Sequence, residues 1–236
     1  MPDTPQDKKQ DLRDHLRVAI LTLRLHPGED LDEVQLSDAF GLSRTPLREV
    51  FRQLAGEGYL ELRTNRSARV SEMSHTTLRD FFLAAPMIYG AVLRLAARNA
   101  RTQQIEDLKT AQARFVDALK SGNAADRTLT NTRFHEITGD MAGNVYLLPS
   151  FNRLLIDHAR IGMTFYQPRD ARRAESLAEA SRQHDAIIAA IEVGNEARAA
   201  RLAEDHWVLS RDQIETFVMP NALDLPLGPL PRASNS

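Results

Sequence analysis

The sequence contains no cysteine, and this absence removes several kinds of chemistry at once. A chain without thiols forms no disulfide bonds, binds no metal through thiolates and offers no cysteine nucleophile. The composition is also typical of a protein from a reducing compartment. Any catalysis or metal binding must therefore rely on other side chains.

Long hydrophobic runs are also lacking. The longest uncharged apolar stretch, Phe81–Leu93, is interrupted by Pro86 and Gly90, and it is shorter than the roughly 18 residues that a membrane-spanning helix needs. The polar first ten residues do not resemble a signal peptide. We therefore expect a cytoplasmic protein that does not contact a membrane.

The chain lacks an excess of charge of either sign, with 30 basic and 32 acidic residues and a net charge of −2. That balance does not suggest a nucleic-acid-binding protein. Residues 43–70, however, hold arginines at six positions and glutamates at only three, which is a local excess of positive charge. DNA needs a basic surface only where it touches the protein, so a small basic face is expected here.

The 236 residues favour one large domain or two ordinary ones, and 42% apolar residues are enough for a core. Apolar spacing and turn residues predict a helix over 8–25, a short helix between Asp32 and Gly41, and a third helix from Ser43 to Gly56 or Gly58. Two short strands are expected over 59–62 and 68–71. Further helices are expected over 76–101, 103–121, 124–141, 144–165, 171–193 and 195–218.

This pattern predicts a mainly α protein in two parts. Residues 1–75 form a winged helix-turn-helix domain of three helices and a β-hairpin, and residues 76–219 form an all-helical bundle. Residues 220–236 hold four prolines and little periodicity, so we expect a flexible tail.

The second and third predicted helices, joined by a turn with glycine, are typical of a helix-turn-helix motif. Arg44, Arg48 and Arg52 recur every four residues and so share one helical face. Arginine matches the two acceptors of guanine in the major groove. An alternative is a solvated helix whose arginines pair with Glu49 and Glu57.

Other polar residues extend this candidate DNA-binding surface. Ser43 and Thr45 stand at the start of the third helix, where a hydroxyl and backbone N–H groups can bind a phosphate. Asn65 and Arg66 stand at the expected tip of the hairpin, where a wing would contact the DNA backbone or the minor groove.

Three of the seven histidines, His135, His184 and His206, stand on the apolar sides of three separate predicted helices. Burying an imidazole without a partner is unfavourable. The three side chains are therefore either separate hydrogen-bonded core residues or a shared metal site. The remaining histidines, His15, His26, His75 and His158, show no such pattern, and we interpret them as ordinary.

Several segments resemble the winged-helix domain of GntR-type bacterial repressors, over about residues 12–71. They are residues 25–31, residues 36–45, the run Ser-Arg-Thr-Pro-Leu-Arg-Glu at 43–49, and Glu-Gly-Tyr-Leu at 57–60. The resemblance implies that Arg44, Thr45 and Arg48 contact the operator. It also implies a homodimer on a palindromic site. The family usually has glycine at the wing tip, near Ser67, and this chain does not.

The helical part is similar to the FCD (FadR-like) branch of this family. Many members hold a divalent metal through an Asp-x-x-x-His pair and two later histidines, and the matching residues here are Asn131 with His135, then His184 and His206. Asn131 replaces the usual aspartate and brings no charge, although its amide oxygen can ligate. Three imidazoles suit zinc or nickel.

The resemblance also implies a small-molecule effector in the helical part. Many members carry an arginine that helps to hold a carboxylate ligand early in the first helix, but residues 81–91 contain none. The hydroxyl of Tyr89 and the side chain of Arg94 are the expected effector contacts. Both a carboxylate and a less charged effector stay open.

Three functions follow, and we predict the first. It is a DNA-binding transcriptional repressor whose operator affinity is controlled by an effector near a buried metal. The alternatives are a metal-dependent hydrolase that uses the three histidines and an architectural DNA-binding dimer that responds to no effector. The sequence has no His-Glu-x-x-His, Gly-x-Ser-x-Gly or phosphate-binding glycine loop, so we do not expect an enzyme.

Overall fold

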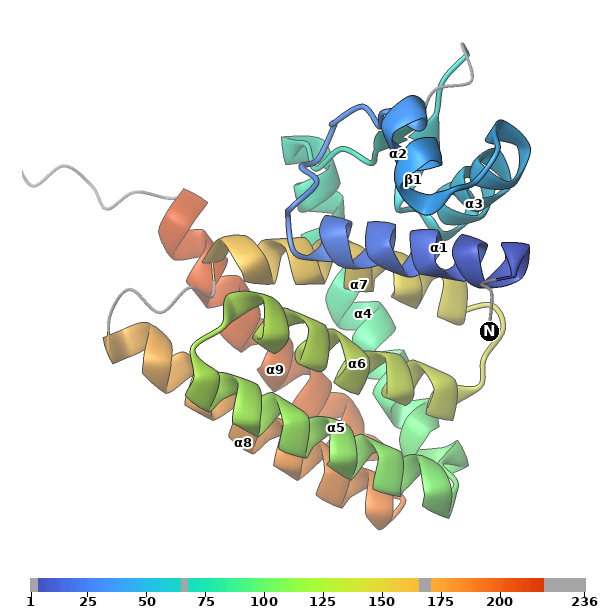
Figure 1. Ribbon diagram of the computed structural model, residues 1–236. Coiled ribbons are helices and arrows are strands. Elements are labelled where there is room, and N and C mark those ends of the chain that lie inside the picture. The colour runs from blue at the N-terminus through green and yellow to red at the C-terminus, as the bar shows by residue number, and fades with distance from the viewer. Residues whose placement is uncertain (1–3, 65–67, 166–170, 219–236) are drawn as a thin grey trace, which may run out of the picture.

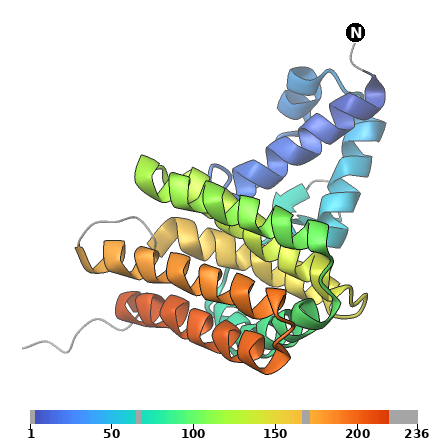
Figure 2. The same cartoon turned by 90° about the horizontal axis from the view of Figure 1, so that it is seen from below.

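The computed structural model describes residues 4–64, 68–165 and 171–218. The N-terminal unit is a winged helix with the elements α1 (Pro5–Leu21), α2 (Glu33–Phe40), α3 (Arg44–Glu57), β1 (Leu60–Leu62) and β2 (Ala68–Val70). The helical domain follows, with α4 (His75–Asn99), α5 (Thr102–Ser121), α6 (Ala124–Ala142), α7 (Leu148–Phe165), α8 (Ala171–Glu192) and α9 (Glu196–Val218). Figures 1 and 2 show the winged helix packed against one side of the helical domain.

These elements confirm the predicted fold class of a winged helix followed by an all-helical domain. The predicted tail, residues 220–236, and the wing-tip residues Asn65 and Arg66 lie outside the described residues.

Helix α1 differs from its predicted bounds at both ends. It begins at Pro5 because Thr4 and Asp7 form a capping box, and proline is well tolerated in a first turn. It ends at Leu21 rather than Leu25. Leu23 adopts a left-handed backbone with φ of 55°, which no α-helix can contain.

The helix-turn-helix is formed as the sequence predicts. The Asp32 carboxylate accepts hydrogen bonds from the first backbone N–H groups of α2, and Gly41 closes this helix in a left-handed conformation. Helix α3 ends at Gly58, so Gly56 lies within the helix. Its apolar stripe is buried against the rest of the winged helix, and consists of Leu47, Val50, Phe51 and Leu54.

Helix α4 is the central helix of the helical domain and packs against α6, α7, α8 and α9. It is the one helix of the described chain that is long and apolar enough to cross a membrane. Length and composition alone are weak grounds for a membrane span, because core helices of globular proteins meet the same criteria. Tyr89 and Val92 are among the α4 residues buried in the bundle, which identifies α4 as such a core helix.

Helix α7 is shared between the two units. Its Phe151 and Ile161 belong to the core of the helical domain, whereas its Ile156 and Ala159 belong to the core of the winged helix. Figure 1 shows α1 lying across α7. The helix starts at Leu148, four residues later than predicted, because the Asn144 side chain accepts two backbone hydrogen bonds and holds a turn there. A movement of α7 would therefore change the packing of both cores.

Candidate DNA-binding surface and histidine site

The start of α3 presents the predicted DNA-binding residues. Ser43, Arg44, Thr45 and Arg52 are all exposed. Ser43 is the N-cap residue, and within the described chain its side chain makes no capping hydrogen bond. Exposed donors at a helix N-terminus can bind phosphate.

Arg48 is half-buried on the same helix and donates to the Glu33 carboxylate of α2, with 2.9 Å between Nη2 and Oε2. Glu49 and Glu57 have hydrogen-bonded partners other than these arginines, and the charge of Arg52 only adds to the effect of Lys9 in lowering the pKa of Glu49. Glu49 pairs with Lys9 of α1, and Glu57 accepts a hydrogen bond from Gln53. Arg44 and Arg52 thus face solvent, while Arg48 is braced against α2.

The three histidines that the sequence placed on apolar helical faces lie close together in the structure. His135 of α6, His184 of α8 and His206 of α9 are buried, and their potential ligand nitrogens all lie within 4.8 Å of one another. Ligands of a tetrahedral zinc at about 2.0–2.1 Å from the metal lie about 3.4 Å apart. Small side-chain movements are enough to bring these nitrogens to that spacing.

A glutamine defines which nitrogen of His184 faces the centre of this trio. The Gln112 amide nitrogen donates to the Ser181 carbonyl and to the Asp185 carboxylate. Its oxygen is therefore turned to His184, and Nδ1–H of His184 donates to that oxygen over 3.0 Å. In this tautomer Nε2 keeps its lone pair, which is the form that binds a metal.

A second glutamine does the same for His206. The Gln183 amide nitrogen donates to the Glu179 carboxylate, so the amide oxygen accepts from Nδ1–H of His206 over 2.9 Å. Two histidines on different helices thus have the same tautomer, each held by an amide of a neighbouring helix or turn.

The site fits a bound metal. Among the described residues, Nε2 of His135 and Nε2 of His184 are buried and have no hydrogen-bond partner. Burial and the neighbouring imidazoles lower the pKa values of His135 and His184 well below 6.5, and burial lowers the pKa of His206 to about 3. Neutral imidazoles with unused nitrogens are the donor set that zinc or nickel takes.

A small cavity of about 30 Å³ adjoins the trio. Its lining includes His206, Asn131, Arg127 and His158. Asn131 lies one turn before His135 on α6 and is half-buried. It therefore lines the same cavity as His206 and His158, and its role as a metal ligand stays a prediction.

The interpretation of His158 as ordinary was wrong. This α7 residue is buried, its ring centroid lies 5.4 Å from that of His135, and burial lowers its pKa to about 4. Its Nδ1 shares a hydrogen bond of 2.9 Å with the Tyr89 hydroxyl. The apolar α7 stripe of Phe151, Leu155 and His158 has the same spacing that indicated the other three histidines, and it could have revealed this one.

The predicted effector contacts separate in the structure. Tyr89 is buried beside His135 and His158. Arg94 is exposed on α4, near Glu196, whose pKa is lowered mainly by its hydrogen bond with Arg98 and to a smaller extent by the charge of Arg94. A different arginine, Arg127, lines the cavity and is only 4% exposed. Arg127 precedes Asn131 by one helical turn, and that spacing was the signal for it in the sequence.

An exposed arginine-bearing helix in a winged helix, joined to an all-helical domain, is typical of a DNA-binding transcriptional regulator. Comparison with known families agrees with this class. The model described as "Bacterial regulatory proteins, gntR family" matches residues 8–70, and the FCD domain model matches residues 86–209. The chain belongs to the GntR family and carries an FCD domain.

Individual relatives point the same way. The chain is 27% identical over 195 residues to a probable D-xylose utilization operon transcriptional repressor from Paenarthrobacter nicotinovorans, with 83% of each chain covered. It is 26% identical over 196 residues to the transcriptional repressor GlaR of Escherichia coli K12, covering 81% of this chain and 88% of the relative. The protein is accordingly a GntR-family transcriptional repressor and not an enzyme, which removes the hydrolase alternative.

Solved structures share the fold. E. coli McbR/YncC superposes with a TM-score of 0.72 at 16% identity, covering 89% of this chain and 97% of that one. A GntR regulator from Rhodococcus sp. RHA1 superposes with a TM-score of 0.63 at 15% identity, covering 89% and 97%. At this identity the likeness concerns the fold alone.

Proposed function

We propose that this repressor acts in the cytoplasm as a homodimer on a palindromic operator, and that a divalent metal and a small effector in the helical domain set its operator affinity. The observation that carries the proposal is the convergence of three buried, neutral histidines, two of which, His135 and His184, keep a buried Nε2 with no hydrogen-bond partner among the described residues. Nothing in core packing alone requires this arrangement, because each unused nitrogen is costly to bury.

Operator recognition falls to the start of α3. Arg44 and Arg48 read base edges, Thr45 and Ser43 bind phosphate, and Arg52 supports the backbone contact one turn further on. Asn65 and Arg66 of the wing complete the surface. Arg48 is presented by its ion pair with Glu33, which reduces the side-chain entropy that it loses on binding DNA.

His135, His184 and His206 hold the metal, with the amide oxygen of Asn131 as a fourth ligand. Zinc or nickel is the expected ion, because nitrogen donors dominate the set. The bound ion supplies a Lewis-acidic centre that an oxygen of the effector can approach. The chain's own residues hold the imidazoles in the ligand tautomer and keep the centre dry.

The effector is a small carboxylate or a molecule with a carboxylate end. Arg127 supplies a buried guanidinium, which binds carboxylates through two parallel hydrogen bonds. The cavity of about 30 Å³ has room for roughly two water-sized groups, since one water needs at least about 10–15 Å³. That is the size of a carboxylate. The Tyr89 hydroxyl, through His158, completes the polar lining.

The homodimer forms through the helical domain. One winged helix reads one half-site, so a palindrome requires a second copy. Leu83 and Met87 lie one turn apart on α4 and are 62% and 75% exposed. Large apolar side chains on a helical face are typical of an interface, and a second copy would cover this pair.

The test of the proposal starts with a palindromic operator selected from a random DNA library. Replacing Arg44 and Arg48 together by alanine should weaken binding at 150 mM salt by tenfold or more, because each base contact is worth about 1–3 kcal/mol. Arg114→Ala, which removes an exposed arginine on α5, is the matched control and should leave affinity unchanged.

The same operator distinguishes the architectural alternative. In the proposed regulator, zinc or nickel together with small carboxylates should shift operator affinity, and Arg127→Gln should remove the carboxylate response. An architectural dimer would bind the operator equally well with the helical site filled or stripped. Such a result would contradict effector control and leave DNA binding intact.

A further inference from the structure

Two polar junctions connect the winged helix to the helices that carry the cavity histidines. The first starts at Glu136, the residue after His135 on α6. Nη2 of Arg17 in α1 donates to the Glu136 carboxylate over 3.1 Å, and Nε of the same arginine donates to the Tyr59 hydroxyl over 3.1 Å. Tyr59 precedes β1, so this junction joins α6 to α1 and to the base of the wing.

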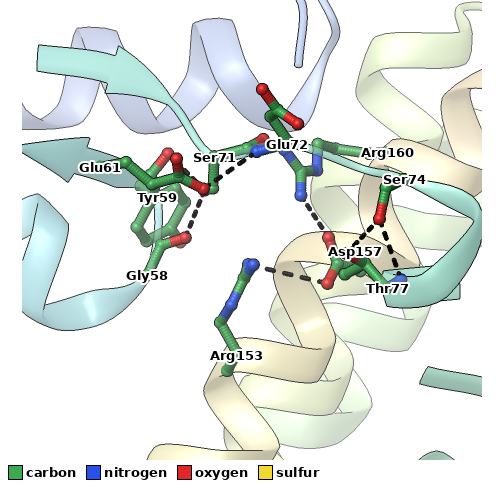
Figure 3. Close-up of polar contacts among 10 residues, drawn as sticks. All are labelled: Gly58, Tyr59, Glu61, Ser71, Glu72, Ser74, Thr77, Arg153, Asp157 and Arg160. Carbon is green, nitrogen blue, oxygen red and sulfur yellow. Dashed lines mark hydrogen bonds and ion pairs between the residues drawn. The ribbon is translucent and has the colours of Figure 1, made fainter. Parts of the chain in front are cut away.

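The second junction starts at Asp157, the residue before His158 on α7. Asp157 and Arg160 are 4% and 0% exposed. Arg160 donates through Nη2 to the Asp157 carboxylate and through Nη1 to the Ser71 carbonyl, the latter over 2.6 Å. Figure 3 shows this group beneath the end of the wing. A charged pair this deeply buried is costly to form, and here it holds the short segment that leads from β2 to α4.

Ser71 links this group to α3. Its hydroxyl lies 2.6 Å from the Gly58 carbonyl and 2.8 Å from the Tyr59 carbonyl, and it donates to both. Arg153, one turn before Asp157, packs so closely that a Cβ at Gly58 would lie 2.4 Å from its Cδ. Gly58 also has φ of 91°, a backbone conformation that favours glycine. The two junctions therefore meet at Gly58 and Tyr59, where α3 ends.

Helix geometry explains why both junctions begin beside a histidine. Successive residues of an α-helix point about 100° apart. His135 of α6 and His158 of α7 both line a second small cavity, beside Tyr89 and His206. Glu136, the residue after His135, pairs with Arg17 of the winged helix. Asp157, the residue before His158, pairs with Arg160, which reaches Ser71 (Figure 3). A shift or rotation of either helix moves both side chains together, because the backbone between them is rigid.

We propose that Glu136 with Arg17, and Asp157 with Arg160, are the positioning residues that couple the histidine site to the DNA-reading helix. A metal bound at the site would draw His135 toward His184 and His206 and so shift α6 and the adjacent α7. The two junctions would then transmit this shift to the end of α3. Changed placement of α3 in each half of the dimer alters operator affinity. This inference rests on the proposed function, because it takes the metal as the signal.

The experiment compares wild type with Glu136→Gln and Asp157→Asn, which keep the side-chain size and remove the charge. Glu106→Gln, an exposed α5 residue paired with Lys109, is the control. Operator dissociation constants are measured with chelator and with saturating zinc chloride. The wild type and the control should show a ratio of about fivefold or more, the lower end of typical couplings. In each junction variant the ratio should fall toward one, with zinc stoichiometry unchanged.

Amide hydrogen exchange gives a second readout that does not depend on DNA. On zinc addition, exchange should change across residues 57–73 in wild type, and this change should be lost in the variants. Exchange across α9 reports that each variant is folded, and Glu136→Gln carries the test if Asp157→Asn fails to fold.

The outcomes separate the two claims. If the variants keep the wild-type ratio of operator dissociation constants and the wild-type exchange response, the proposed coupling through the junctions is wrong. A wild type that binds zinc and changes exchange at 57–73, with no change in operator affinity, contradicts the regulatory proposal and supports the coupling. A wild type that takes up no zinc overturns the metal site and, with it, this coupling.

Discussion

At His184, one amide group decides which imidazole nitrogen faces the other histidines. Gln112 is 5% exposed and is held by Ser181 and Asp185, so its oxygen accepts from Nδ1–H of His184. Partners of this kind fix the tautomer and raise the basicity of the ligand nitrogen. The chemistry of the site therefore depends on residues that the sequence pattern did not single out.

Replacing Gln112 by leucine tests this dependence. The change removes the acceptor, so the His184 ring loses its orientation and we expect metal affinity to fall about 10–100-fold, as for other outer partners of metal ligands. Affinity is measured by competition with a chelating dye. Gln103→Leu, an exposed glutamine on the same helix, should leave affinity unchanged. Equal affinities of the two variants would show that Gln112 has only a packing role.

At the scale of the element, α7 carries buried polar groups whose partners could not be identified from the sequence. His158, Asp157 and Arg160 are all buried. Burial lowers the pKa of His158 from 6.5 to about 4, so the folded state binds fewer protons than the unfolded state between these values. Stability then falls as the pH drops through that window.

The protein freed of metal by a chelator should therefore lose stability as the pH falls below about 6.5. A shift of one pKa unit corresponds to 1.36 kcal/mol, so His158 alone lowers the free energy of unfolding by about 3 kcal/mol once the pH reaches 4. The other buried histidines act in the same direction. Urea unfolding at pH 7.5, 6 and 5 measures the loss, and His158→Asn should show a shallower dependence. A flat profile between pH 7.5 and 5 would contradict the buried neutral state.

The elements were predictable where local chemistry decides them. Asp32, Gly41 and Gly58 mark helix ends through caps and left-handed turns, and the structure has them there. The end of α1 was not predicted correctly because the sequence has no capping residue there. Only the left-handed backbone of Leu23 in the structure shows where the helix ends. The burial of His135, His184 and His206 followed from their apolar stripes, whereas their convergence was one of two open interpretations.

Tertiary pairing was not predictable from one sequence. The Arg48 partner, Glu33, lies on the preceding helix, and Arg160 is paired across the two units with Ser71. No periodicity signals the hydrogen bond from Arg160 to Ser71, because this carbonyl lies far away along the chain. Arg127 and His158 stand at helical spacings that indicated an inward-facing position. Their importance became clear only when the structure showed that both line the cavity.

At the scale of the whole molecule, the proposed homodimer is the property on which operator binding is expected to depend. Leu83→Glu with Met87→Glu places two like charges per chain on the exposed face of α4, so we expect a monomer at micromolar concentration by light scattering. Operator affinity should fall with it, since one winged helix reads only one half-site. Val193→Glu, an exposed apolar residue between α8 and α9, is the control and should remain dimeric. A double variant that stays dimeric would place the interface elsewhere.

The central claim is that the three histidines form a metal site and not a packed core. The most direct measurement is metal content by mass spectrometry, on protein purified without a histidine tag and supplied with zinc or nickel at pH 7.5. The account predicts about one ion per chain, lost in His184→Ala and His206→Ala together with thermal stability. Less than about 0.1 ion per chain in the unmodified protein would contradict it, and the histidines would then serve packing alone.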